Sequence, residues 1–243
     1  MKTRLMPGRI TIVFALALAV GGASLRAQPA PVDVKKDVRF RILTLEELPE
    51  GRVFYDIGKK AIPVSAPIGR KSFEYALPPG QELSFYTPVQ TGETVTKRLI
   101  AKTQFPPGTR KALLVLARAP AGAELPYTIR TLADLARTQP AGSALVFNFS
   151  TETVAVKLYK EGLMLQPGED KGAQLVADLP YLPLQVYART GDDQWNLVAS
   201  ATEQLFPKAR IIVLLCPRDQ AKSGPMRAVI EMELPEPVVA GAN

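Results

Sequence analysis

The sequence contains no histidine and a single cysteine, Cys216. Without imidazole the chain cannot build a Ser-His-Asp or Cys-His nucleophile, or a metal site that depends on histidine. One cysteine also excludes an internal disulfide and a cysteine cluster for zinc. We therefore predict that the protein is not an enzyme and carries no cofactor or metal. Cys216 lies in the aliphatic run "RIIVLLCPR", which predicts a buried, unreactive thiol; an exposed thiol that pairs with a partner is the alternative.

Paired carboxylates, which can hydrolyse glycosidic bonds, are an enzyme chemistry that this composition leaves open. The candidate acids form three groups beside glycine or proline, namely Glu46, Glu47 and Glu50, then Glu169 and Asp170, then Asp192 and Asp193. Acidic residues beside glycine or proline usually make local hydrogen bonds in turns. We expect these acids to serve turns rather than catalysis.

The sequence also lacks an apolar run long enough for an ordinary membrane-spanning helix, which needs about 20 residues. Its N-terminal run, "ITIVFALALAV", has eleven residues without a charge, follows Lys2, Arg4 and Arg9, and leads to small residues before Ala27. This three-part pattern predicts a signal peptide over residues 1–27, with a retained N-terminal anchor as the alternative. The mature protein is then expected in the bacterial envelope, either periplasmic or secreted, with no membrane span.

The positive charge of the whole chain comes largely from this N-terminal segment. The chain has 30 basic and 23 acidic residues, and four of the basic ones lie in residues 1–27, so the remainder carries 26 minus 23, or +3. Its lysines and arginines are scattered rather than gathered into a stripe, which argues against a nucleic-acid partner. We expect the partner to be another envelope protein, and the oligomeric state stays open.

Proline and glycine are plentiful, with 22 and 17 residues, and they separate short segments in which apolar and polar residues alternate. Residues 38–44 ("VRFRILT") and 153–159 ("TVAVKLY") show this period of two, which indicates strands with one buried face. Strand-sized segments with turn residues every 8–12 positions are typical of sandwiches. The one segment with helical spacing, "IRTLADLART" at 129–138, predicts a strand end followed by a short helical linker.

The predicted fold class is therefore all-β, with two tandem immunoglobulin-like antiparallel β-sandwich domains of seven or eight strands each. The predicted organisation is a flexible segment over 28–37, domain 1 over 38–135, domain 2 over 136–236 and a disordered tail over 237–243. The second domain reads as a duplicate of the first, because four short matches recur in the same order. They pair Pro49 with Pro140, Gly80 with Gly168, Phe105 with Phe206, and Pro126 with Pro225.

Two aliphatic runs, "ALLVLA" at 112–117 and "IIVLLC" at 211–216, do not alternate. A sandwich strand meets the core with one face only, and each large aliphatic side chain left in water forfeits about 1.5–3 kcal/mol. A loop, the other sandwich or a separate protein must therefore cover the second face. We expect the outer faces of residues 113–116 and 212–215 to be buried within one molecule.

Three functions fit these features. The first is a non-catalytic envelope protein that acts in protein–protein interaction or structural support. The second is carbohydrate binding, for which the candidate ligand-binding residues are Trp195, Tyr181 and Tyr187, since aromatic rings stack on sugar faces. The third rests on general layout, in which the chain resembles periplasmic pilus chaperones. That resemblance implies that strand 112–117 is offered to a subunit, whose carboxylate is held by basic residues such as Arg39 and Arg41.

Overall fold

A computed structural model describes residues 37–48, 52–120, 122–175, 180–190, 194–217 and 226–234. The predicted signal peptide over 1–27 and the predicted tail over 237–243 lie outside the described residues. So does the predicted flexible segment over 28–37, apart from Asp37. No helix in the described ranges is long and apolar enough to cross a membrane.

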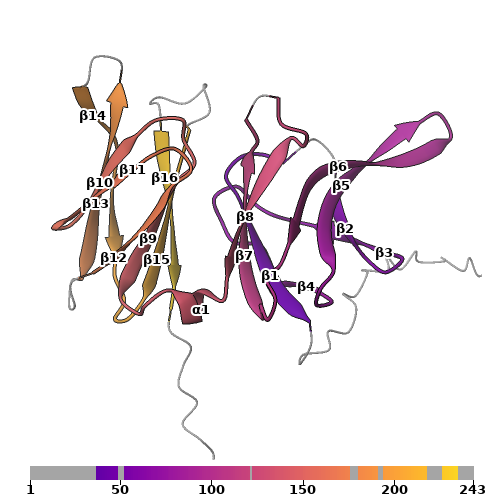
Figure 1. The fold of residues 1–243 in the computed structure, drawn as a ribbon, viewed down its shortest axis with the longest axis horizontal. Helices are drawn as coiled ribbons and strands as arrows, with labels where there is room; N and C mark the ends of the chain where they lie inside the picture. The colour runs from indigo at the N-terminus through magenta and orange to yellow at the C-terminus, as the bar shows by residue number, and fades with distance from the viewer. Residues whose placement is uncertain are drawn as a thin grey trace, which may run out of the picture. The chain divides into compact units, whose positions relative to one another are not determined.

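Within these ranges the chain forms sixteen strands and one short helix, α1 (Leu135–Thr138), and the all-β prediction is confirmed (Figure 1). Before the helix lie β1 (Val38–Thr44), β2 (Val53–Ile57), β3 (Lys60–Val64), β4 (Tyr75–Leu77), β5 (Glu82–Thr91), β6 (Thr94–Gln104), β7 (Lys111–Arg118) and β8 (Tyr127–Ala133). After it lie β9 (Ser143–Asn148), β10 (Val154–Leu158), β11 (Glu161–Leu165), β12 (Asp170–Gln174), β13 (Tyr181–Thr190), β14 (Gln194–Gln204), β15 (Arg210–Pro217) and β16 (Met226–Glu233).

The strands form four sheets of four. Sheet A has the order β4-β1-β7-β8 and sheet B the order β3-β2-β5-β6; sheet C has the order β12-β9-β15-β16 and sheet D the order β11-β10-β13-β14. Adding eight to each strand number converts sheet A into sheet C and sheet B into sheet D. Sheets A and B therefore make an N-terminal sandwich, and sheets C and D make a C-terminal sandwich of the same strand order.

The agreement between the sandwiches extends to their irregularities. All neighbouring strands run antiparallel except β1 with β7 and β9 with β15, which are parallel in both copies. The long hairpin β5–β6 shifts register between Phe85 and Tyr86, and the hairpin β13–β14 shifts at the equivalent Val186 and Tyr187. A β-bulge is an inserted residue that bends a strand, and such bulges are fixed features of a fold. The repeated bulge supports the predicted duplication.

Of the four sequence matches that suggested this duplication, one is in register. Pro126 comes just before β8 in the sequence, and Pro225, which lies outside the described residues, comes just before the equivalent strand β16. Two others are wrong, because Pro140 precedes β9, the counterpart of β1, whereas Pro49 precedes β2, and Gly80 and Gly168 stand between strands that do not correspond. Pro-Gly turns recur wherever strands end, since these residues suit tight turns regardless of ancestry.

The match of Phe105 with Phe206 is wrong by one position. In each sandwich a turn closes before the long central strand, where the Thr109 amide donates to the Pro106 carbonyl and the Ala209 amide donates to the Phe206 carbonyl. Phe206 therefore corresponds to Pro106, and Phe105 corresponds to Leu205. Phe105 is 9 % exposed within the core, whereas Phe206 is 48 % exposed on the turn.

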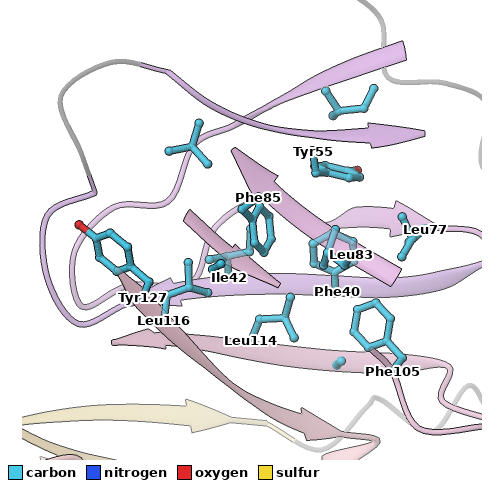
Figure 2. Close-up of a cluster of buried hydrophobic side chains, with 14 of the residues drawn as sticks. Phe40, Ile42, Tyr55, Leu77, Leu83, Phe85, Phe105, Leu114, Leu116 and Tyr127 are labelled. Carbon is cyan, nitrogen blue, oxygen red and sulfur yellow. The ribbon is translucent and has the colours of Figure 1, made fainter. Parts of the chain in front are cut away.

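Each sandwich has its own core between its two sheets. The N-terminal core is rich in aromatic side chains (Figure 2), with Phe40 at 5.6 Å from both Tyr55 and Phe105, measured between ring centroids. The C-terminal core is built from aliphatic side chains such as Val156, Leu184 and Val213. Alternate residues along the strands of both sheets supply these cores, as the period of two predicts.

A third cluster covers the second face of the aliphatic strands. Leu113 and Val115 of β7 pack in it with Ile212 and Leu214 of β15, and these four side chains are at most 5 % exposed. The outer faces of sheets A and C thus bury each other, and the expectation that both runs are covered within one molecule is confirmed. The same contacts also join the two sandwiches to each other. The division into domain 1 over 38–135 and domain 2 over 136–236 therefore stays a prediction.

The connection between the sandwiches is held at both ends. Asp134, whose φ is 44°, accepts hydrogen bonds from the backbone amides of Arg110 (3.2 Å) and Lys111 (2.9 Å) at the start of β7. Leu135 of α1 is buried in the third cluster. Gln139 then donates from Nε2 to the Ser143 carbonyl at 3.1 Å and the Ile211 carbonyl at 3.0 Å. The predicted strand end and helical linker over 129–138 are confirmed.

Candidate functional site

The three aromatic residues that the sequence singled out lie on β13 and β14 in sheet D. Leu182, Leu184 and Val186 of β13 point into the C-terminal core, so the alternate residues Tyr181 and Tyr187 belong to the outer face. Trp195 lies on that face too, because it stands opposite Arg189 across the β13–β14 ladder.

Tyr187 is the centre of an apolar row that crosses all four strands of sheet D. It stands opposite Leu197 on one side and Ala155 on the other, and Ala155 stands opposite Met164. We call Met164, Ala155, Tyr187 and Leu197 the apolar row. Met164 is 52 % exposed and Leu197 is 54 % exposed, although both are large hydrophobic side chains. Trp195 is diagonal to Tyr187, which is within reach of an aromatic side chain.

Tyr181 does not join this group. It stands at the first position of β13, opposite Gln204, six residues from Tyr187. At about 3.3 Å per residue, that separation is about 20 Å along the strand. The structure thus brings together two of the three predicted residues and adds Met164 and Leu197. Alternation puts Leu197 on the face of Trp195, but sequence alone could not say that β11 would place Met164 beside them.

Polar groups border the apolar row. The Tyr187 hydroxyl lies 3.2 Å from Gln185 Oε1 and donates to it, and Gln185 stands opposite Lys157 in the neighbouring strand. An apolar centre with hydrogen-bonding neighbours is the usual composition of a recognition surface.

In sheet B the counterpart of Tyr187 is Tyr86, and its neighbours cover it. There the Phe54 and Tyr86 rings stack at 6.0 Å between centroids, and Lys97 Nζ lies 4.5 Å from the Tyr86 centroid. The Tyr86 hydroxyl donates to Asp56 Oδ1 at 2.6 Å, and Lys97 pairs with Asp56 Oδ2 at 2.5 Å. Tyr86 is left 5 % exposed.

These contacts shift the pKa values of Asp56 and Tyr86. Burial by itself would raise the pKa of Asp56, but the hydrogen bonds from Lys97 and Tyr86 outweigh burial and hold that pKa below its ordinary value. Burial, and next the hydrogen bond to Asp56, raise the pKa of Tyr86. Both shifts favour the observed pairing of a carboxylate with a neutral phenol and an ammonium group.

Three of the candidate acids make ion pairs with basic side chains. Glu46 pairs with Arg118 at 2.9 Å, Glu169 pairs with Lys171 at 3.2 Å, and Asp170 pairs with Arg130. Glu50, Asp192 and Asp193 lie outside the described residues. No group of three or more cysteine, aspartate or glutamate side chains in the described ranges could hold a metal ion.

Cys216 is buried, as the sequence predicts, at 2 % exposure. Burial raises the pKa of its thiol, which the nearby Arg227 only partly offsets. A thiol must ionise before it acts as a nucleophile, so this environment suppresses its reactivity. Cys216 contributes to packing in the third cluster.

The two features implied by the pilus-chaperone resemblance lie on neighbouring strands, because Arg41 of β1 stands opposite Leu113 of β7. Strand β7, which contains residues 112–117, is hydrogen-bonded to β1 on one side and β8 on the other, so it has no free edge to offer a subunit. Arg39 and Arg41 lie on the outer face of sheet A and line a cavity there.

No family model matches the chain, and no curated protein matches it.

Proposed function

We propose that this protein is an exported, non-catalytic envelope protein that binds another protein through the apolar row of sheet D. The observation that carries this proposal is the exposure of Met164, Leu197 and Trp195 on one face, whereas Tyr86, the counterpart of Tyr187 in sheet B, is only 5 % exposed beside Phe54 and Lys97. Exposed apolar patches bordered by polar residues commonly mark interaction sites.

The architecture supports a binding role. The third cluster and the anchored linker join the sandwiches, so the apolar row is carried on a preorganised body. A preorganised surface loses little conformational entropy when a partner binds. Aromatic residues such as Trp195 and Tyr187 contribute strongly when they are buried at the centre of an interface.

Site-specific crosslinking in cells tests this role. A photoreactive residue at Leu197 should give one protein adduct, whereas the same residue at Val95, which is exposed on β6 of sheet B, should not. Met164→Asp should then abolish the adduct at Leu197, because the substitution places a charge at the other end of the apolar row. Equal adducts at both positions, or none at Leu197, would contradict the proposal.

Carbohydrate binding is the second candidate, and the adjacency of Trp195 and Tyr187 favours it. The two functions differ in what they require of the surface. A sugar needs the aromatic pair, so Trp195→Ala should abolish binding to a polysaccharide array while Met164→Asp leaves it intact. A protein partner that covers the whole apolar row should be lost in both variants.

Export itself rests on the N-terminal sequence pattern. Fractionation should find the protein outside the cytoplasm, and N-terminal sequencing should begin at Gln28, the residue after the predicted cleavage site. A mature protein that begins at Met1 and stays in the cytoplasm would overturn this part of the proposal.

A further inference from the structure

A cavity of about 310 Å³ lies between the outer faces of sheets A and C, beside the third cluster. It is found where β1 and β7 begin and β16 ends. At this end sheet A presents charged residues on its outer face, whereas further along the same strands it presents Leu43 and Val115, which sheet C covers. The cavity is therefore basic on one side and apolar on the other.

The apolar side is formed by leucines. Leu113 of β7, Leu132 of β8 and Leu135 of α1 line the cavity and also belong to the third cluster. Leu234, which follows β16, lines it as well and is 54 % exposed. A ligand that covers this leucine removes apolar surface from water, which stabilises the bound state.

The charged side carries more cations than anions. Four basic residues line the cavity, Arg39, Arg41, Lys71 and Lys111, against two acidic ones, Glu74 and Glu233. Arg39 pairs with Glu74 at 3.2 Å, and Lys71 pairs with Glu231 at 3.5 Å. Within the described residues, the structure gives Arg41 no acidic partner within ion-pair distance.

We propose that this cavity binds a small amphipathic monocarboxylate, with the carboxylate on Arg41 and the hydrocarbon chain over the leucines. An arginine can hold a carboxylate through two parallel hydrogen bonds, which are stronger than hydrogen bonds between neutral groups. The volume is at the lower end of the range for small-molecule sites, about 300–1,000 Å³, and so suits a medium-chain fatty acid. The site is separate from the apolar row and does not depend on the proposed function.

Calorimetric titration of the mature protein with decanoate tests the proposal at pH 7, with decanol as a neutral ligand of the same chain length. Decanoate should bind saturably at one site and about tenfold or more tightly than decanol, as expected for a hydrogen bond to a charged group. Equal affinity for the two ligands would contradict the contact between the carboxylate and Arg41. If neither ligand binds saturably, the proposal that the cavity is a binding site is wrong.

Two pairs of variants locate the site. Arg41→Gln should weaken decanoate binding about tenfold, whereas Arg98→Gln on β6 of sheet B should not change it. Leu234→Asp should also weaken it, whereas Val95→Asp, at a side chain that is 64 % exposed on β6 of sheet B, should not. An equal loss of decanoate affinity in both members of a pair would contradict the placement of the ligand in this cavity. If a variant does not fold, as judged by circular dichroism, the comparison of decanoate with decanol on the unaltered protein still decides.

Discussion

The two sandwiches share a strand order and a bulge but fill their cores with different side chains. Phe40, Tyr55 and Phe85 of the N-terminal core correspond by strand and register to Ala144, Val156 and Val186. The N-terminal aromatic rings contact one another edge to face or tilted, with centroids 5.6–6.2 Å apart. The described C-terminal core is packed with aliphatic side chains instead.

This difference shows what the topology requires. Alternating buried positions and the placement of turns are common to both sandwiches, whereas volume at a given core position is not. Where Phe40 is replaced by Ala144, the turn before the central strand also exchanges a buried Phe105 for a partly buried Leu205. Each of these exchanges places a smaller side chain in the C-terminal core, so one strand order accommodates cores of different volume.

The largest effect is expected where the sandwiches meet. Val115→Asp and Leu214→Asp each bury an unpaired charge in the third cluster, where both side chains are fully buried. Each should lower the free energy of unfolding by more than about 4 kcal/mol. Urea unfolding followed by circular dichroism, with Trp195 fluorescence as a C-terminal probe, should show that both sandwiches are destabilised together.

Leu197→Asp is the control for this pair, because its side chain is exposed on sheet D. It should change the free energy of unfolding by no more than about 0.5 kcal/mol. If Val115→Asp unfolded the N-terminal sandwich and left the fluorescence transition of Trp195 unchanged, the third cluster would not couple the two.

The next largest effect separates two phenylalanines that occupy similar sequence contexts. Phe105→Ala removes a ring that packs on Phe40 in the N-terminal core and should cost about 3–5 kcal/mol. Phe206→Ala removes a ring exposed on a turn and should cost less than about 1 kcal/mol. Chemical denaturation of the two variants measures both, and similar losses would contradict the assigned turn register.

Alkaline pH should weaken the N-terminal core through Tyr55, whose counterpart Val156 does not ionise. Burial raises the pKa of Tyr55 to about 12, against about 10 in an unfolded chain. The folded state thus favours the neutral phenol. The contribution of the neutral phenol to the free energy of unfolding is complete below pH 10 and is lost as the pH rises toward 12. The loss should reach about 2–3 kcal/mol.

Unfolding free energies measured from pH 8 to 11.5 would check this effect. Tyr55→Phe should reduce the slope of stability against pH by about one proton, at the cost of about 1 kcal/mol at neutral pH for the lost hydrogen bond to the Ala76 carbonyl. An unchanged slope in Tyr55→Phe would show that other groups cause the alkaline loss.

The smallest effect on stability is expected where the last strand of each sandwich ends, at Asp134 after β8 and at Glu233 of β16. Asp134 accepts hydrogen bonds from the Arg110 and Lys111 amides, whereas its counterpart Glu233 makes no such bond to another described residue. Asp134→Asn keeps one acceptor oxygen and should cost about 1 kcal/mol, while Glu233→Gln should stay within about 0.5 kcal/mol. Thermal unfolding of the two variants compares them, and equal shifts would remove the special role of Asp134.

Sequence reasoning succeeded where the signal was local and periodic. Alternation in residues 38–44 predicted β1, and the loss of alternation in residues 112–117 predicted a strand buried on both faces. It failed at the repeat, since Pro-Gly turns and a Phe-Pro pair look alike at positions that do not correspond. For the candidate site, it named Trp195 and Tyr187 but included the distant Tyr181 and missed Met164, because neighbours across a sheet depend on pairing.

By itself, the sequence determined that the chain is all-β and that two aliphatic strands need cover on both faces, because these properties follow from residue period and apolar area. Only the tertiary structure decided that sheets A and C cover each other, that Phe105 is buried and Phe206 exposed, and that the cavity behind Arg41 lies next to leucines. Those outcomes depend on strand order and register, which bring together residues that are far apart in the chain.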